Sequence, residues 1–479
     1  MLAEEHLPRT LFWLIALVEF PSMRKTFVIV GAGFSGTVLA ANLLRHPPSD
    51  GADIILIERS GAMGRGVAYA AHEFPYLLNV PAARSSAVSR EPLQFLRFAQ
   101  ARVPNVDGED FLPRALYGEY LQELLFSAER DAPPNVRLRR VQGEVTGILQ
   151  TDGAAPLGAQ FADRAPILGH AVILALGNPP APLPPWAEKL RGHPAFRQDP
   201  RDLPATLTAD QSVLIVGNGL TMADAASVLS RHPDRIPTLH TISRRGLTPK
   251  TQTEFHADAM RGSGEALLAS THSLAKLLRA CRLMAREVEN LGGDWREAVS
   301  FIRNLVPTLW RALPQTERRR FVRHLQVHWD TYRHRLPPQL SERIEHLRRS
   351  GKLLIHAGRI QGAAAAQGGL RVSWRPRGGG TTQEMTVAMV VNATGPNYNI
   401  ESSADPLMNS LRSAGLISPD ALNLGLRSAR FGACVNPQGH VSRQLYYLGP
   451  LLRAEHLDVT AAAELSMHAE ELAAHLAEG

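Results

Sequence analysis

Cysteine is scarce in this sequence. Among 479 residues only Cys281 and Cys434 occur, far apart in the chain. Two distant cysteines exclude a disulfide framework, a cysteine-rich zinc site and a C-x-x-C redox pair. The histidines His324, His328 and His334 stand among arginines without a clustered acid, so the sequence predicts no metal site there either. This cysteine usage is typical of a reducing, cytoplasmic compartment.

Long hydrophobic runs are also missing. The apolar run nearest the N-terminus, residues 11–18, has eight residues, whereas a membrane span needs about 20. The residues before it are not basic enough for a signal peptide. We therefore expect no membrane association, with Met23 as the natural start and residues 1–22 as an upstream extension. An apolar helix docked on the body is the alternative.

A strong charge of either sign is absent as well. The chain has 52 lysines and arginines against 45 aspartates and glutamates, a net charge of +7. This charge is mild for the length and does not indicate nucleic-acid binding. With 44% hydrophobic residues the chain can build sizeable cores, which excludes a disordered or fibrous protein. The length predicts roughly three domains.

The first strong pattern is a strand, a glycine-rich turn, a helix and a second strand. Residues 26–30 form a short apolar run rich in β-branched side chains, and residues 36–44 have helical spacing. A second apolar strand, residues 53–57, ends at Glu58. This β–α–β unit predicts parallel strands joined by a right-handed crossover.

The turn of this unit reads G-A-G-F-S-G. Gly31 permits the tight turn, Gly33 lets the backbone approach a pyrophosphate, and Gly36 permits close helix–strand packing. The N-terminus of the helix offers amide groups to the phosphates, and Glu58 can accept the ribose hydroxyls. A purely structural glycine turn is the alternative. The predicted dinucleotide contacts are Gly31, Gly33, Phe34, Ser35, Gly36, Glu58 and Arg59.

A second β–α–β unit begins at residue 212. Strands 212–216 and 238–243 flank a helix over residues 221–230, and Met222 replaces the third glycine of the turn. The second strand runs into Ser243-Arg244-Arg245 instead of an acid. Arginines there would pair with a 2′-phosphate, which favours NADPH over NADH; a solvated basic turn is the alternative. The predicted contacts are Gly217, Gly219, Leu220, Thr221, Ser243, Arg244 and Arg245.

Two later strands also end in a small residue and a glycine. Residues 171–176 run into Gly177, and residues 385–391 run into Asn392-Ala393-Thr394-Gly395. Glycine after a buried strand lets the chain cross close to a bound cofactor. We therefore add Gly177, Thr394 and Gly395 to the predicted cofactor contacts.

Between and around these units the pattern changes. Residues 256–347 lose strand signals and read as a helical insertion, while residues 179–185 form a proline-stiffened linker. Further predicted strands are residues 352–356 and 370–374. The stretches 363–369 and 375–380 are predicted to be turns. Further predicted helices are residues 93–101, 117–130 and 460–476. The sequence predicts two discontinuous domains and an insertion. The first domain consists of residues 23–205 and 385–479, and the second consists of residues 206–255 and 348–384. The helical insertion, residues 256–347, interrupts the second domain.

Several motifs, taken as a set, resemble the bacterial FAD/NAD(P)-binding protein family, which is similar to N-hydroxylating and Baeyer–Villiger flavin monooxygenases. They are G-R-G-V-A-Y at 64–69, L-L-N-V-P-A at 77–82, F-L-P-R at 111–114, Y-G-E-Y at 117–120, G-L-T-M-A-D at 219–224, S-R-R-G-L at 243–247, A-T-G-P-N-Y at 393–398 and G-P-L-L-R at 449–453. The resemblance implies an α/β fold with two Rossmann-type domains, FAD at the first glycine turn and NADPH at the second. It adds Gly449 and Pro450 to the cofactor contacts.

The same resemblance places Asn79 near the flavin, as the candidate catalytic residue. Its amide can hydrogen-bond the isoalloxazine or the substrate, or it can form an Asx-turn. Arg65 and Arg114 can reach a phosphate or an anionic substrate, or lie at the surface. The basic side chains of the insertion form a solvated helix face or meet a carboxylate-bearing substrate or acidic carrier protein.

Three functions follow as hypotheses. The first is an FAD-dependent, NADPH-consuming monooxygenase that uses O2 through a flavin C4a-hydroperoxide to hydroxylate a small substrate, with an amine as a candidate. The second is a reductase that passes electrons to an external acceptor. The third is a flavin-binding scaffold or sensor without turnover. The cysteines exclude a disulfide reductase, because neither has a neighbouring partner.

Overall fold

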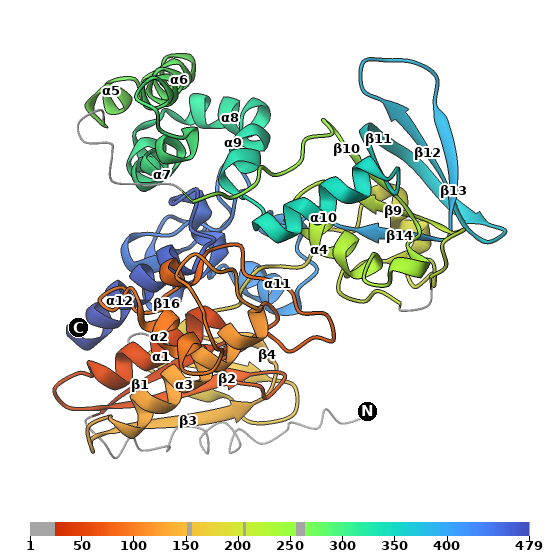
Figure 1. Ribbon diagram of the computed structural model, residues 1–479. Helices are drawn as coiled ribbons and strands as arrows, with labels where there is room; N and C mark the ends of the chain where they lie inside the picture. The colour runs from red at the N-terminus through yellow and green to blue at the C-terminus, as the bar shows by residue number, and fades with distance from the viewer. Residues whose placement is uncertain (1–23, 151–155, 205–206, 255–263, 479) are drawn as a thin grey trace, which may run out of the picture.

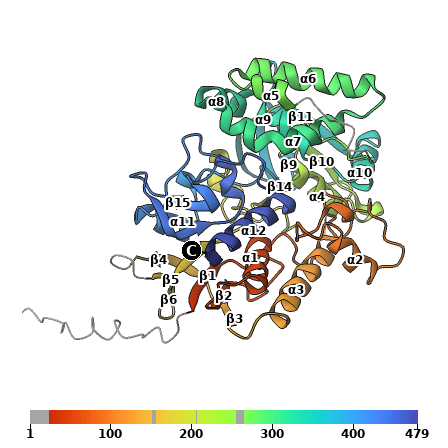
Figure 2. The same ribbon diagram turned by 90° about the vertical axis from the view of Figure 1, so that its left-hand side faces the viewer.

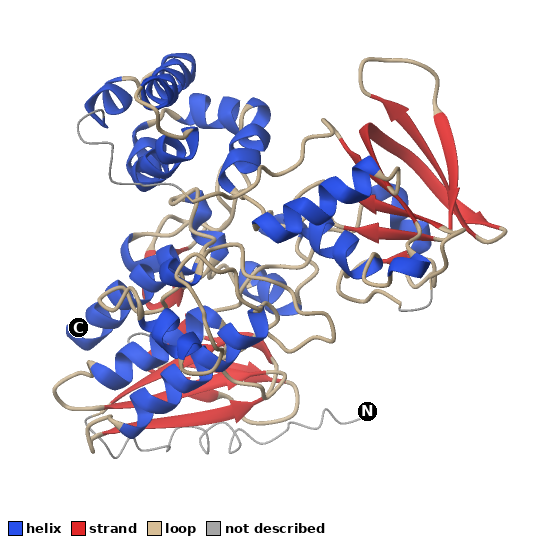
Figure 3. Cartoon of the chain, in the orientation of Figure 1, coloured by secondary structure: helices blue, strands red, loops and turns tan. Residues whose placement is uncertain are grey.

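The computed structural model describes residues 24–150, 156–204, 207–254 and 264–478. The expected extension 1–22 and the start of the expected insertion, 256–263, lie outside the described residues. Two large sheets and a group of helices that stands apart from both make up the described chain (Figures 1 and 3). The predicted α/β class with two Rossmann-type sheets is confirmed. No helix within the described ranges is long and apolar enough to cross a membrane.

The first sheet has six strands in the order β15-β16-β7-β1-β2-β3, and only β15 is antiparallel to its neighbour. The strands are β1 (Lys25–Val30), β2 (Ala52–Glu58), β3 (Val136–Gln142), β7 (Ala171–Leu174), β15 (Ala433–Val435) and β16 (Val441–Tyr447). The sequence predicted β1, β2 and β7, which are apolar and buried. It missed β3, in which arginines interrupt the apolar pattern of an edge strand.

Helix α1 (Phe34–Arg45) is buried on nearly every side, because it packs between the first sheet and the helices α3 (Arg114–Arg130) and α12 (Ala462–Glu478). Figure 2 shows α12 lying alongside α1, although the two are more than 400 residues apart in the sequence. Helix α2 (Gln94–Gln100) packs against α3. The C-terminal helix therefore closes the core that the first β–α–β unit opens.

A small antiparallel sheet, which the sequence did not predict, follows β3. Its strands are β4 (Val145–Leu149), β5 (Leu157–Phe161) and β6 (Ile167–Gly169). Helix α11 (Pro406–Ser413) packs against β4.

The second sheet has seven strands in the order β13-β12-β11-β10-β9-β14-β8. They are β8 (Phe196–Arg197), β9 (Ser212–Val216), β10 (Thr238–Ser243), β11 (Leu353–Ala366), β12 (Gly369–Pro376), β13 (Gln383–Val387) and β14 (Met389–Asn392). The strands from β8 to β11 are parallel, and β11, β12 and β13 form an antiparallel extension. Helices α4 (Leu220–Leu229) and α10 (Pro338–Arg349) pack together, and α10 contacts β11.

Two sequence expectations about this sheet are wrong. Residues 385–391 are not one strand: the chain leaves the antiparallel β13, passes Ala388 and enters the parallel β14, which lies on the other side of β9 and β10. Residues 363–366 are not a turn, because they continue β11 and pair with β12, from Ala363 opposite Val372 to Ala366 opposite Gly369. The turn-like stretch from residue 375 likewise begins inside β12.

Hydrogen bonding also crosses the expected domain boundaries. Strand β8 lies before residue 206, and most of β13 and all of β14 lie after residue 384, yet all three belong to the second sheet. Most of helix α10 lies within the expected insertion, 256–347, but the helix packs on the second sheet.

The helices between the two halves of the second sheet form their own core. They are α5 (Gly264–Ala269), α6 (Leu274–Asn290), α7 (Trp295–Ala312), α8 (Gln315–His324) and α9 (Gln326–Arg333). Their buried side chains include Leu277, Met284 and Trp310. The Nε1 atom of Trp310 donates to the carbonyl of Ala454 at 2.8 Å, which joins this helical insertion to the C-terminal segment.

Candidate functional site

The predicted residues gather at two sheet edges. In the first sheet the adjacent parallel strands β16, β7, β1 and β2 lead into Gly449, Gly177, Gly31 and the Glu58–Arg59 pair. In the second sheet the adjacent parallel strands β10, β9 and β14 lead into Arg244, Gly217 and Thr394. Parallel α/β sheets bind ligands outside the carboxyl ends of their strands. Each edge is therefore a candidate dinucleotide site.

The glycines of the first turn differ in their surroundings. Gly31 has a φ of +100°, and a Cβ atom there would lie 2.3 Å from the carbonyl oxygen of Ala175. At Gly36 a Cβ atom would lie 1.9 Å from the carbonyl oxygen of Gly31. At Gly33 the nearest atom would be the Cα of Gly66, at 3.6 Å, so the protein itself leaves room there. No side chain caps α1, whose first residues are Phe34 and Ser35, so its first amide groups are available to a ligand.

The carboxylate of Glu58 is fixed beside this turn. Its Oε2 accepts a hydrogen bond from the amide of Ala32 at 3.0 Å, and its Oε1 accepts from the amide and hydroxyl of Ser60 at 3.2 and 2.9 Å. Arg59 points away to solvent, with 65% of its side chain exposed and Glu144 at 3.9 Å. The structure thus brings Glu58 to the turn but not the side chain of Arg59.

An aromatic cluster packs against the start of α1, next to this turn. The rings of Tyr69 and Tyr117 lie 4.8 Å apart, and both contact Phe34 at the start of α1. Burial raises the pKa of Tyr69 to about 12, so its hydroxyl stays protonated at neutral pH. The hydroxyl of Tyr117 is buried without a hydrogen-bond partner in the described chain.

The loop that carries Asn79 is held by the start of α3. The amide of Leu78 donates to the carbonyl of Leu112 at 2.8 Å, and Arg114 Nε donates to the carbonyl of Leu77 at 2.9 Å. The Oδ1 atom of Asn79 is buried and has no partner among the described residues, so it forms no Asx-turn. Proline at position 81 lacks the amide that such a turn needs. The side chain is therefore available to a ligand.

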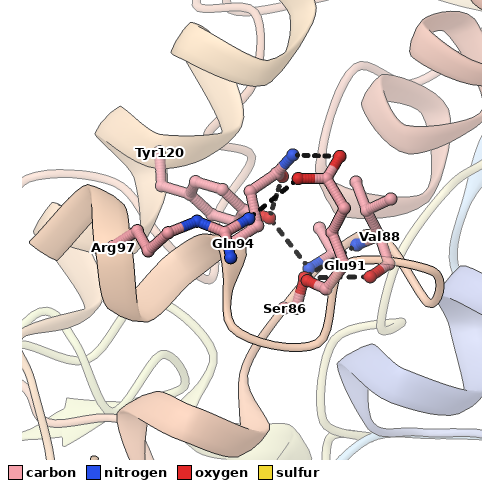
Figure 4. A network of polar contacts seen from close by, with 7 residues as sticks. Ser86, Val88, Glu91, Gln94, Arg97 and Tyr120 are labelled. Carbon is pink, nitrogen blue, oxygen red and sulfur yellow. Dashed lines mark hydrogen bonds and ion pairs between the residues drawn. The ribbon is translucent and has the colours of Figure 1, made fainter.

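A polar network fixes the continuation of this loop (Figure 4). The hydroxyl of Ser86 donates to the carbonyls of Val88 and Glu91 at 3.0 and 2.7 Å. The carboxylate of Glu91 accepts from Gln94 and Arg97, and Tyr120 donates to Gln94 at 2.7 Å. The loop is thus clamped between α2 and α3, which keeps the segment after Asn79 rigid.

The second glycine turn, at residues 217–219, has nearly the same geometry as the first. Gly217 has a φ of +115°, and a Cβ atom there would lie 2.2 Å from the carbonyl oxygen of Ala393. A Cβ atom at Gly219 would meet nothing within 4 Å, and no side chain caps α4, which begins at Leu220 and Thr221. Asn218 is 5% exposed, yet neither polar atom of its side chain has a partner among the described residues.

The two arginines of the basic turn after β10 have different surroundings. Arg244 is exposed, and no ion pair involves it within the described ranges. Arg245 Nη1 lies 3.1 Å from the carbonyl oxygen of His324 and 2.6 Å from Nε2 of His328. The hydroxyl of Ser243 accepts from the amide of Gly246 at 3.0 Å, which shapes the turn. Arg244 is therefore the freer of the two guanidinium groups.

A buried asparagine, which the sequence did not single out as a site residue, joins the two chain crossings between the sheets. Asn392 Nδ2 donates to the carbonyl of Pro182 at 2.9 Å, and its Oδ1 accepts from the hydroxyl of Thr394 at 2.7 Å. The amide of Asn397 donates to the carbonyl of Pro180 at 3.1 Å. The crossings at Gly177 and Gly395 are thus tied together. A polar residue ending an apolar strand was the available signal.

Arg114 has a different use from the one predicted. Its Nη2 lies 2.9 Å from the Oδ2 of Asp224, and the pair joins α3 to α4. Burial raises the pKa of Asp224, and Arg114 partly opposes that rise. Arg65 donates to Gln122 at 3.1 Å. The Arg114 guanidinium is therefore committed to an ion pair between the two halves of the molecule.

Comparison with known proteins supports the fold and the assignment of the first glycine turn to a nucleotide-binding family. A family model described as FAD-NAD(P)-binding matches residues 28–179. Among solved structures, L-lysine 6-monooxygenase of Pseudomonas syringae has a TM-score of 0.62 at 16% identity, and ornithine hydroxylase of Pseudomonas aeruginosa has 0.59 at 16%; both alignments cover 95% of this chain and 99% of the other. The cadaverine monooxygenase of Erwinia amylovora, solved with FAD, has a TM-score of 0.58 at 13% identity and 95% coverage of each chain.

No curated protein matches the sequence significantly. At identities this low the structural likeness shows the fold alone. The family match covers the end of β1 and all of α1 and β2, the elements that carry the first glycine turn and Glu58. Residues 28–179 of this two-sheet fold are thus an FAD/NAD(P)-binding domain.

Proposed function

We propose that the chain is an FAD-dependent, NADPH-consuming monooxygenase that hydroxylates a small substrate, with an amine as the first candidate. The observation that carries the proposal is the pair of glycine turns at the carboxyl edges of two parallel sheets, joined by tied crossings at Gly177 and Gly395. The monooxygenases of lysine, ornithine and cadaverine share this fold, which supports the choice of an amine.

The first edge fits FAD. The uncapped N-terminus of α1 suits a pyrophosphate, and Gly33 leaves space beside it. The fixed carboxylate of Glu58 suits the ribose hydroxyls. The unpartnered Oδ1 of Asn79 suits a hydrogen-bond donor on the flavin or the substrate. Gly449 and Pro450, after β16, complete the set on the other side of Gly177.

The second edge fits NADPH. The open space at Gly219 and the uncapped N-terminus of α4 suit a second pyrophosphate. The buried side chain of Asn218 has unused donor and acceptor atoms beside that turn. Arg244 supplies an exposed guanidinium where a 2′-phosphate would lie.

Bound FAD would supply hydride acceptance from NADPH and the reaction with O2. For an amine substrate the balanced reaction takes one NADPH, one proton and one O2 and gives NADP⁺, water and the hydroxylamine. The chain's part is to bind both nucleotides, orient the substrate and exclude water. The clamped loop after Asn79 and the neutral, half-buried Tyr69 would serve those tasks.

The test uses the purified full-length protein. It should be yellow, contain non-covalent FAD and oxidise NADPH faster when a true substrate is present, with the oxygen of ¹⁸O2 appearing in the product. Stopped-flow mixing of the reduced protein with O2 should show a transient absorbing species before oxidised flavin returns. Immediate reoxidation with one peroxide per NADPH across lysine, ornithine and cadaverine would instead favour a reductase. Failure to bind FAD at all would overturn the proposal.

A further inference from the structure

The antiparallel extension of the second sheet ends beside the basic turn that follows β10. Ser243 and Ala357 are parallel partners at this edge of β10 and β11. The amide of Arg377, the first residue after β12, donates to the carbonyl of Ala357 at 2.8 Å. Ser243, Ala357 and Arg377 therefore form one row across three neighbouring segments, and each step of such a row is about 4.8 Å.

The basic turn folds onto this row. A Cβ atom at Gly246 would lie 3.2 Å from the Cβ of Ala357, so the turn contacts Ala357 on one face of the sheet. Residues that pair directly across two strands present their side chains on the same face. The side chain of Arg377 therefore starts on the face that carries the turn of Arg244.

Arg245, the other arginine of the turn, is committed to the helical insertion. Its Nη1 lies 3.1 Å from the carbonyl oxygen of His324 and 2.6 Å from Nε2 of His328. Loss of hydration is the largest cause of the lowered pKa of His328, and the charges of Arg245, Arg377 and Arg282 lower it further. The charges that act on this ring are therefore all positive.

Arg244 and Arg377 are both exposed and lack counter-ions. Neither guanidinium takes part in an ion pair or a hydrogen bond within the part of the chain that the structure describes. A ligand can reach both groups from solvent, without a buried cavity. Two guanidinium groups on neighbouring segments suit a dianionic phosphate monoester, which each of them can meet with charge-assisted hydrogen bonds.

We propose that Arg377 is a second specificity-determining residue for the nicotinamide nucleotide, and that its guanidinium binds the 2′-phosphate together with that of Arg244. This inference rests on the proposed function, because it takes the turn of Gly217 and Gly219 as the NADPH site. Arg245 is then a positioning residue, which holds the insertion against the turn and leaves the phosphate to its neighbours. The antiparallel extension thereby takes part in the choice between NADPH and NADH.

The test compares 2′,5′-ADP with 5′-AMP, two probes that differ only by the 2′-phosphate, by calorimetric titration of the purified full-length protein. The wild type should bind 2′,5′-ADP at least about a hundredfold more tightly, as expected for two charge-assisted contacts. Arg377→Gln should lose about tenfold of that preference with 5′-AMP binding unchanged, and Arg377→Lys should recover part of the loss.

Arg371→Gln is the matched control. Arg371 is also an exposed arginine of β12 without an ion pair among the described residues, but it pairs with Ala364, far along the extension from the turn. The control should keep the full preference for 2′,5′-ADP. An equal loss in Arg371→Gln and Arg377→Gln would indicate a general effect of positive charge, which would overturn the inference.

The remaining outcomes separate this inference from the proposed function. An unchanged preference in Arg377→Gln, combined with a lost preference in Arg244→Gln, would overturn the role of Arg377 and leave the NADPH site in place. Equal weakening of both probes with a lower melting temperature in Arg377→Gln would make Arg377 structural and also overturn the inference. A wild type that binds the two probes equally would contradict both the inference and the NADPH assignment.

Discussion

At the residue scale, the glycines of the two nucleotide turns divide into those that the fold requires and those that only a ligand requires. Gly31, Gly36 and Gly217 would each bring a Cβ atom within 2.3 Å of a backbone oxygen. Gly33 and Gly219 would not, because their Cβ directions are open or in ordinary contact. Substitutions at the two kinds of position should therefore have different consequences.

We expect Gly33→Ala to lower FAD affinity while the apoprotein keeps its stability, because the methyl group fits the protein but stands beside the uncapped helix end. Gly36→Ala is the contrasting variant. Its Cβ would overlap the Gly31 carbonyl, so the free energy of unfolding should fall by about 1–3 kcal/mol. Flavin titration and urea unfolding of the apoproteins measure the two effects. Wild-type flavin affinity in Gly33→Ala would show that the turn does not hold the cofactor.

Arg244 and Arg245 should also separate. Arg244→Ala should weaken NADPH binding roughly ten- to a hundredfold and leave NADH binding and thermal stability unchanged, because it removes one exposed charge-assisted contact. Arg245→Ala, in contrast, should lower thermal stability, because Arg245 contacts His324 and His328 of the insertion. Titration calorimetry with both nucleotides gives the affinities. An equal loss for NADPH and NADH in Arg244→Ala would make Arg244 structural.

At the scale of elements, one ion pair connects the helices of the two sheets. Arg114 begins α3, and Asp224 lies in the first turn and a half of α4. Their side chains are 23% and 18% exposed, so water screens the pair only in part. The guanidinium also supports the carbonyl of Leu77, next to the Asn79 loop. The pair therefore links the loop at the first edge to the helix of the second.

Asp224→Asn should lower the free energy of unfolding by about 1–3 kcal/mol, because it leaves the Arg114 charge half-buried without its partner. Asp163→Asn, which breaks the solvent-exposed pair with Arg164, is the control and should leave stability unchanged. Urea denaturation followed by tryptophan fluorescence measures both. A double variant that also carries Arg114→Met should recover part of the loss, and full additivity would rule out the coupling.

At the scale of the whole molecule, the helical insertion closes on the C-terminal segment through charged and aromatic contacts. His334 and His456 are kept neutral there: burial lowers their pKa values from 6.5 to about 3 and about 4. Asp330 behaves oppositely, because burial raises its pKa from 3.8 to about 6. These groups couple stability to pH in different directions.

We expect stability to depend on pH through these groups. Between about pH 3 and 6.5 the unfolded chain binds protons on the two histidines that the folded chain does not, so their contribution to stability rises with pH. Between about pH 4 and 6 the folded chain keeps the Asp330 proton that the unfolded chain has lost, which opposes that rise. His334→Gln should flatten the rise and Asp330→Asn should steepen it. Urea midpoints from pH 4 to 7 test both, and unchanged slopes would contradict the assignment.

Features that depend on neighbours close in the chain could be predicted from the amino-acid sequence. Both β–α–β units, both glycine turns, Glu58 at the end of β2 and the helical character of the insertion follow from short-range periodicity and turn chemistry. The separation of residues 385–391 into β13 and β14 did not follow, because an apolar run has the same pattern in an antiparallel extension as in a parallel core. The arginine-interrupted edge strand β3 lacks the pattern altogether.

Contacts between distant side chains could be found only from the folded structure. Asn392 reaches the carbonyl of Pro182, Arg114 reaches Asp224, and Arg377 lies beside the turn of Arg244 without a carboxylate of its own. In each case the two partners are more than 100 residues apart in the sequence. Residue type and spacing specify what a side chain can bind, but packing of distant elements determines which partner it finds and which charge is left for a ligand.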